Sequence, residues 1–133
     1  MQDFLQVVKN LSIVAAGGAV GAVSRYVVSG LTHRMFNTSF PLGTLAVNTT
    51  GCLLIGFLLE TATQTTLVSD SWRLALGIGF LGALTTFSTF GYETLQLARE
   101  SQWTLAFANI ATNLLIGLFS VWLGVIAARL VTS

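Results

Sequence analysis

The sequence predicts an all-α membrane protein with four transmembrane helices in a single domain. Three observations predict this fold class. Residues of the set AVILMFWYC make up 53% of the 133 residues, and Asp, Glu, Lys and Arg make up only 8%, against about a quarter in a soluble domain. Four apolar runs reach the length of about 20 residues that a helix needs to cross about 30 Å of hydrocarbon. A chain this short exposes a large share of its surface, and it has too few charged residues to make that surface polar, which excludes a soluble enzyme.

The four predicted spans cover residues 11–31, 41–62, 72–97 and 103–131. The first run has an alternative interpretation as a cleaved signal peptide, because Lys9 precedes an apolar run that ends in small residues. The three further spans, and the continuation of the first apolar run past Arg25, favour a helix that is retained in the protein. The second span begins at Pro41, a residue that suits the first turn of a helix.

The third and fourth spans begin with capping and interfacial residues. Asp70 or Ser71 is expected to cap the third helix, and Ser101 the fourth. Trp72 and Trp103 then fall at the depth of the membrane interface, where tryptophan is enriched.

Basic residues are divided evenly between the two sides of a four-span arrangement. One side holds Lys9, Arg73 and Arg129, and the other holds Arg25, Arg34 and Arg99. The positive-inside rule therefore gives no bias, and we infer that the chain inserts in both directions. Oppositely inserted copies would pair antiparallel about a two-fold axis in the membrane plane. The alternative is a single topology set by one or two charges at unequal depth.

Side-chain amides and hydroxyls recur at helical spacing inside the spans, where polar groups are costly. Thr44 and Asn48 are one turn apart in the second span, and Asn109 and Asn113 in the fourth. Helix packing accounts for the small residues of these stripes, namely Gly17, Gly21, Gly51, Gly56 and Gly124. Two amides in line on one helix and a third on another exceed what packing requires, and they supply NH2 donors.

The charges inside the spans separate two classes of transporter. A proton-coupled cation exporter needs a carboxylate within its spans, and the interiors of the first two spans contain none. Arg25, a permanent cation, favours an anion or a structural partner; alternatively its side chain extends to the interface. Glu93 lies deep in the third span, and we expect it at a vestibule, as a rim charge or an arginine partner.

The densest polar signal is the run GFLGALTTFSTFGYET, residues 79–94. Its glycines, threonines and serine are poor or middling helix formers in the middle of a span. One interpretation is a helix broken near the midplane, whose freed carbonyls can coordinate a cation. The other is an unbroken helix whose hydroxyls bond to their own backbone. Phe87 and Phe90 lie on one side of such a helix, and an aromatic ring has a positive edge that can contact an anion.

Three strings in this order resemble the Fluc fluoride channels, also called CrcB proteins. They are GGAVGAVSRY (17–26), GTLAVNTTG (43–51) and GFLGALTTFSTFGYET (79–94), and the third is the most specific. The resemblance covers nearly the whole chain. It implies an antiparallel, dual-topology homodimer with two fluoride pores and a structural sodium ion at the dimer interface.

By motif position, the resemblance also implies roles for individual residues. Asn48, Phe87 and Phe90 would line the fluoride path, and the backbone carbonyls of Gly82 and Thr85 would hold the sodium. The candidates for the rest of the path are Thr44, Ser88, Thr89, Asn109 and Asn113. The last two depart from the family pattern, in which many members carry a tyrosine and then a serine.

The resemblance, together with the pattern of polar residues, implies a fluoride-selective channel of the bacterial inner (plasma) membrane, embedded in lipid, that passively exports cytoplasmic fluoride and relieves its toxicity. The alternatives are a small proton-coupled exporter of the multidrug type and a non-transporting assembly subunit held together by its glycine faces. No catalytic constellation is visible, so no enzyme is predicted. The net charge of +1, without a basic cluster, argues against a nucleic-acid partner.

Overall fold

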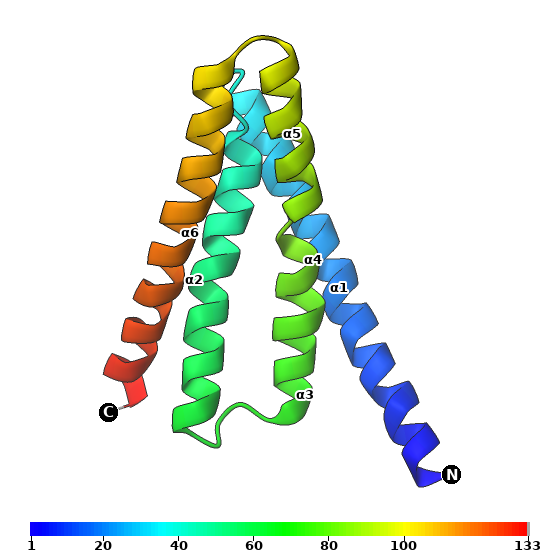
Figure 1. Ribbon diagram of the computed structural model, residues 1–133. Coiled ribbons are helices and arrows are strands. Elements are labelled where there is room, and N and C mark those ends of the chain that lie inside the picture. Colours follow the sequence, from blue (N-terminus) through cyan, green and yellow to red (C-terminus); the bar gives the residue numbers. More distant parts are fainter. Residues whose placement is uncertain (133) are drawn as a thin grey trace.

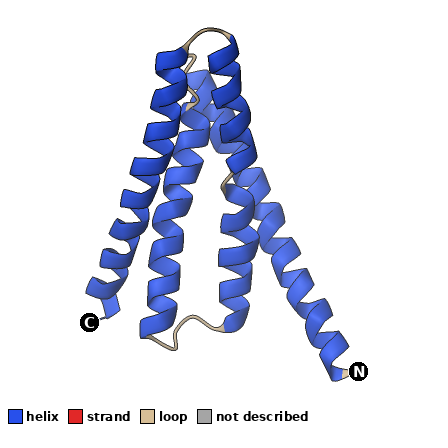
Figure 2. Cartoon of the chain, viewed as in Figure 1, coloured by secondary structure: helices blue, strands red, loops and turns tan. Residues whose placement is uncertain are grey.

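The computed structural model describes residues 1–132, and every element in this range is helical (Figures 1 and 2). Two long helices come first, α1 (Gln2–Met35) and α2 (Leu42–Gln64). The third pass consists of α3 (Asp70–Trp72), the π-helical segment η1 (Arg73–Leu81), α4 (Gly82–Leu84) and α5 (Phe87–Arg99). The chain ends with α6 (Trp103–Thr132).

Four helical segments are long and apolar enough to cross a membrane: Gln2–Met35, Leu42–Gln64, Asp70–Arg99 and Trp103–Thr132. The first begins well before the predicted residue 11 and ends beyond residue 31. Both described chain ends lie at one end of the bundle, as an even number of passes requires (Figure 1).

The start of the third pass differs from the sequence-based expectation. Ser69, not Asp70 or Ser71, is the N-cap residue, and its hydroxyl accepts a hydrogen bond from the backbone N–H of Trp72 at 3.5 Å. Asp70 lies in the first turn instead, where its negative charge favours the N-terminal end of the helix dipole.

Two pairs of elements pack most closely, α2 with α6 and α1 with η1. Between α1 and η1, a methyl group added at Gly17 would meet the carbonyl oxygen of Ala75, and one added at Gly21 would meet that of Phe80. These glycines therefore permit backbone-to-backbone contact, which confirms their predicted packing role.

The pair α2 and α6 uses the same device. A Cβ at Gly56 would meet the carbonyl of Val121, and one at Gly124 would meet that of Leu53. The first turns of α1, by contrast, lie apart from the other helices (Figure 1). Gly21 is the one residue of α1 that is buried. A single copy therefore leaves most of its apolar side chains uncovered.

Candidate functional site

The third pass is interrupted at Thr85 and Thr86. Both residues are extended, with φ −78° and ψ 155° at Thr85 and φ −151° and ψ 113° at Thr86. The hydroxyl of Thr86 caps α5 by accepting a hydrogen bond from the N–H of Thr89 at 3.2 Å. The Cγ2 of Thr85 packs where a side chain at Gly51 would otherwise stand. The interruption is therefore held by specific contacts on both sides.

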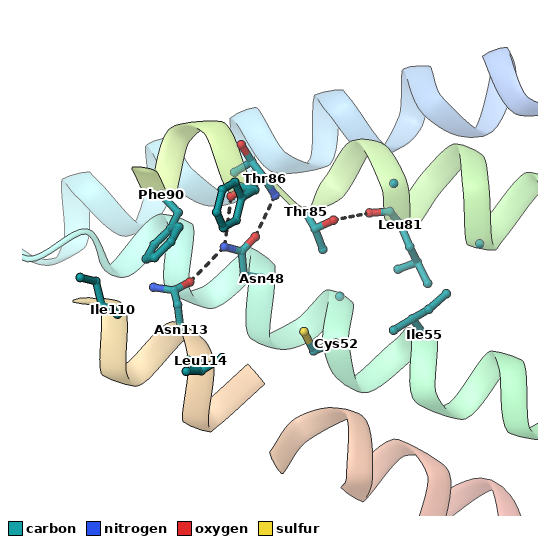
Figure 3. Close-up of a pocket in the computed structure, with 14 residues that line it drawn as sticks. Asn48, Cys52, Ile55, Leu81, Thr85, Thr86, Phe90, Ile110, Asn113 and Leu114 are labelled. Atoms are coloured by element: carbon teal, nitrogen blue, oxygen red, sulfur yellow. Dashed lines mark hydrogen bonds between the residues drawn. The ribbon is translucent and has the colours of Figure 1, made fainter. Parts of the chain in front are cut away.

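Asn48 on α2 binds the backbone of the interruption at two points. Its Oδ1 accepts from the N–H of Thr86 at 2.8 Å, and its Nδ2 donates to the carbonyl of Thr86 at 3.2 Å (Figure 3). A helix would have used these backbone groups internally, and the amide side chain replaces part of that pairing.

A line of hydrogen bonds continues from Asn48 across to α6 and α5. The Nδ2 of Asn48 donates to Oδ1 of Asn113 at 3.0 Å, and Nδ2 of Asn113 donates to Oδ1 of Asn109 at 2.9 Å. Asn109 then donates to Oγ1 of Thr94 at 2.8 Å, and Thr94 donates to the carbonyl of Phe90 at 2.7 Å. Every bond in this line has the same direction, from α2 toward α5.

Backbone groups fix that direction at both ends. The N–H of Thr86 can only donate, so it requires the oxygen of Asn48 on its side. At the other end, the backbone carbonyl of Asn109 accepts from Nδ2 of Asn113 at 3.1 Å, so the NH2 of Asn113 must face Asn109. The carbonyl oxygen of Asn113 is consequently turned toward Asn48.

A cavity of about 620 Å³ opens beside this network, between α2, α6 and the interrupted third pass. Its lining contains six of the predicted site residues, Asn48, Gly82, Thr85, Phe87, Phe90 and Asn113. The other lining residues are Gly51, Cys52, Ile55, Gly77, Leu81, Thr86, Ile110 and Leu114, and Figure 3 shows the cavity with most of these labelled. Amide and hydroxyl groups, not charges, provide its polar surface.

Phe87 and Phe90 form a pair at the start of α5. Their ring centroids are 5.5 Å apart, and the ring planes meet at 53°. Phe87 is 82% exposed, whereas Phe90 is half-buried. The neighbouring Ser88 and Thr89 are also exposed, and the hydroxyl of Thr86 donates to that of Thr89 at 2.9 Å.

Thr44 and Glu93 lie apart from this cavity, in a second, smaller one of about 200 Å³ beside the loop between α1 and α2. The buried hydroxyl of Thr44 donates to Oε1 of Glu93 at 2.9 Å. Oε2 of Glu93 is buried and has no hydrogen-bond partner among residues 1–132. The structure therefore places Glu93 against a threonine and beside a polar cavity, not against an arginine.

The side chain of Arg25 contacts the interruption of the third pass and does not extend to the membrane interface. Its Nη1 lies 3.5 Å from the carbonyl oxygen of Thr85. Thr89, the residue four positions on, gives its N–H to Thr86 Oγ1, and the N–H of Thr86 goes to Asn48. The helical donors for the carbonyls of Thr85 and Gly82 are thus engaged elsewhere, which leaves both oxygens able to accept other partners.

The structure also places residues that the sequence analysis did not single out. Thr86 and Thr94 are both part of the hydrogen-bond network, together with the predicted Asn109, which is fully buried and contacts Asn113. Thr86 could have been predicted from the sequence, because threonine is a preferred N-cap residue at the start of a helix. Thr94 could not, because its partner Asn109 lies on another helix.

The chain is similar to a known family and to several named relatives. Residues 12–125 match the family described as "CrcB-like protein, Camphor Resistance (CrcB)". A relative from Geobacter sulfurreducens named fluoride-specific ion channel FluC is 46% identical over 116 residues, which are 87% of this chain and 94% of the relative. Relatives with the same name from Acidobacterium capsulatum (45% over 116 residues, 87% and 93%) and Dehalococcoides mccartyi (46% over 112 residues, 84% and 86%) are similar. The match spans most of the chain, and this four-span protein belongs to the CrcB family.

Proposed function

We propose that this chain forms a channel that conducts fluoride passively out of the bacterial cell and so relieves fluoride toxicity. The observation that carries the proposal is the uncharged, donor-rich cluster around Asn48 in a family whose relatives are named fluoride-specific channels. Fluoride holds its hydration water tightly, so a pore must replace that shell with donors of modest strength that also let the ion leave. Amides, hydroxyls and ring edges meet this requirement better than a fixed cation.

The direction of flow follows from the chemistry of the ion. Hydrogen fluoride crosses a membrane as a neutral acid and ionises in the more alkaline cytoplasm, where fluoride accumulates. A passive pathway in the plasma membrane then returns it outward without an energy source or covalent chemistry. The named relatives are ion channels, a class that is distinct from enzymes.

The working unit in this proposal is an antiparallel homodimer of oppositely inserted copies. The even division of basic residues supports dual insertion. The exposed Ser88 and Thr89 support a second copy, because hydroxyls that face hydrocarbon are unfavourable. A two-fold axis in the membrane plane would bring the two interruptions together near the bilayer midplane and let Phe87, 82% exposed in one copy, face the partner.

Gly82 and Thr85 are the proposed ligands of a structural sodium ion. Both line the cavity, and their carbonyl oxygens are released from helical pairing at the interruption. Carbonyl oxygen is a suitable ligand for a hard cation, and two copies would double the number of ligands. When bound, the ion would supply positive charge that offsets the facing carbonyls of the two copies. Arg25, 3.5 Å from the carbonyl of Thr85, already provides part of that charge.

The experiment that tests this function uses purified protein in lipid vesicles loaded with potassium fluoride, with the potassium ionophore valinomycin present. Fluoride efflux that needs no pH gradient supports the channel. Uptake of an organic cation that depends on a pH gradient would support the proton-coupled exporter instead, with Glu93 as its carboxylate. Absence of both activities would contradict the proposal and favour an assembly subunit.

A further inference from the structure

We propose that Asn113 determines the ion specificity of this pathway by acting as an internal competitor of the permeating anion. In this role its carbonyl oxygen, not its NH2 group, matters, because it occupies an N–H of Asn48 that the anion must take over. This inference rests on the proposed fluoride conduction.

The first step is that Asn48 has no donor to spare. An amide nitrogen carries two protons, and the Nδ2 of Asn48 donates to two acceptors, the Asn113 Oδ1 at 3.0 Å and the Thr86 carbonyl at 3.2 Å. An anion in the cavity can therefore receive a hydrogen bond from Asn48 only by displacing one of them.

The bond to Asn113 is the one that can yield. Thr86 is tied to Asn48 a second time through its N–H at 2.8 Å, so that side of the amide is anchored. Asn113 and Asn48 are joined by a single side-chain bond, and both line the cavity. When an anion replaces it, the released oxygen of Asn113 still faces the cavity, where water can hydrate it.

Asn113 cannot escape this role by turning over. Its NH2 group donates to the backbone carbonyl of Asn109 at 3.1 Å and to the side-chain oxygen of Asn109 at 2.9 Å. Asn109 is fully buried and is itself held by Thr94 at 2.8 Å. Rotation of the Asn113 amide would set its oxygen against two other oxygens, so the carbonyl remains turned toward Asn48.

The consequence is a threshold for hydrogen-bond acceptance. An anion must accept the Asn48 proton more strongly than an amide carbonyl does. Fluoride concentrates its charge on a small sphere and forms strong charge-assisted hydrogen bonds, whereas the larger chloride ion accepts more weakly. Specificity by a competing internal contact is a form of discrimination against the wrong ligand. The same bond also limits how tightly fluoride is held, which allows its release.

The decisive variant is Asn113→Leu, which keeps the side-chain size and removes the carbonyl. Efflux of fluoride and of chloride is measured from vesicles containing the full chain, with fluoride varied over a concentration series. We expect the chloride-to-fluoride efflux ratio to rise about fivefold, the factor that corresponds to one hydrogen bond, and the half-saturating fluoride concentration to fall. Thr132→Val is the control, because Thr132 also lies on α6 and its hydroxyl bonds to the backbone carbonyl of Ala128 at 2.9 Å, away from the network; its ratio should stay at the wild-type value.

An unchanged ratio in Asn113→Leu, or a raised half-saturating fluoride concentration, would overturn the competitor role and make Asn113 a direct donor. Absence of fluoride efflux from the wild-type protein would instead contradict the proposed function itself, so the two failures are distinguishable.

A second measurement on the wild-type protein does not depend on the folding of a variant. With asparagine side chains labelled by ¹⁵N, added sodium fluoride should shift one Nδ2 proton of Asn48, and sodium chloride at the same concentration should not. The exposed Asn37 is the internal control. Equal shifts with both salts, or no shift at Asn48, would overturn the proposal.

Discussion

Asn48 is hydrogen-bonded to both backbone groups of Thr86, accepting from its N–H at 2.8 Å and donating to its carbonyl at 3.2 Å. One side chain of α2 thereby fixes the interruption of the third pass and, through Asn113, connects it to α6. The same amide is thus both a structural contact of the interruption and the proposed donor to the anion.

Asn48→Asp should abolish fluoride conduction while the fold persists. The aspartate can still accept from the N–H of Thr86, but it loses both amide donors and adds a negative charge beside the path. A repulsion of several kcal/mol at an effective dielectric of about 20 predicts a fall in fluoride efflux of more than about 100-fold. Asn37→Asp, in the exposed loop, is the control and should conduct normally. Wild-type efflux from the Asn48→Asp protein would remove Asn48 from the path.

Phe87→Ile should lower fluoride efflux about fivefold without loss of dimerisation, since the contact of an aromatic edge contributes about 1 kcal/mol. Isoleucine retains the apolar surface and removes the positive ring edge. Phe107→Ile provides the comparison, because Phe107 is another exposed phenylalanine, at 66%, on α6. Efflux and chemical crosslinking are measured on the same preparations. Equal efflux from the two variants would show that the ring of Phe87 has no special contact with the ion.

Gly124→Ala should destabilise the protein by about 1–3 kcal/mol, the usual effect of overpacking. The added methyl group would meet the carbonyl oxygen of Leu53 and lie 2.8 Å from the backbone nitrogen of Phe57, so α2 and α6 would have to separate. Gly30→Ala is the matched control, because nothing lies within 4 Å of a Cβ at Gly30 in α1. Thermal denaturation in detergent should show a lower midpoint for Gly124→Ala alone; equal midpoints would contradict the close packing of α2 against α6.

Thr86→Val should weaken the start of α5 by about 1 kcal/mol, the typical effect of losing an N-cap. Valine keeps the volume of the 7%-exposed side chain and removes the acceptor of the Thr89 N–H. Thr61→Val is the control and should leave the start of α5 unchanged, because the hydroxyl of Thr61 bonds to the carbonyl of Phe57 within α2. Hydrogen exchange of the Thr89 amide reports the change directly. Unaltered protection of that amide in Thr86→Val would show that the cap does not hold the helix start.

Part of this arrangement could be predicted from the sequence because it depends on local composition. Long apolar runs predict spanning helices whatever their neighbours are, and the run from residue 79 to residue 94 indicates where helix propensity fails. The packing role of Gly56 and Gly124 can also be predicted, because a glycine allows close contact with whichever helix faces it.

The rest depends on which helices meet. Sequence spacing shows that Asn109 and Asn113 share a face of one helix, but not that Asn113 turns its oxygen toward Asn48. That orientation is decided by the Thr86 N–H and the Asn109 carbonyl, both of which act across or along the assembled bundle. For the same reason, neither the contact of Thr94 with Asn109 nor the π-helical course of η1 (Arg73–Leu81) can be predicted from the sequence.

The most direct test of the central claim is the ratio of fluoride to chloride efflux through the wild-type protein. Vesicles loaded with equal concentrations of the two potassium salts are treated with valinomycin, and ion-selective electrodes follow both anions. A fluoride-selective pathway predicts rapid release of fluoride while chloride stays inside. Release of both anions at similar rates, or retention of both, would contradict a fluoride-selective pathway at Asn48.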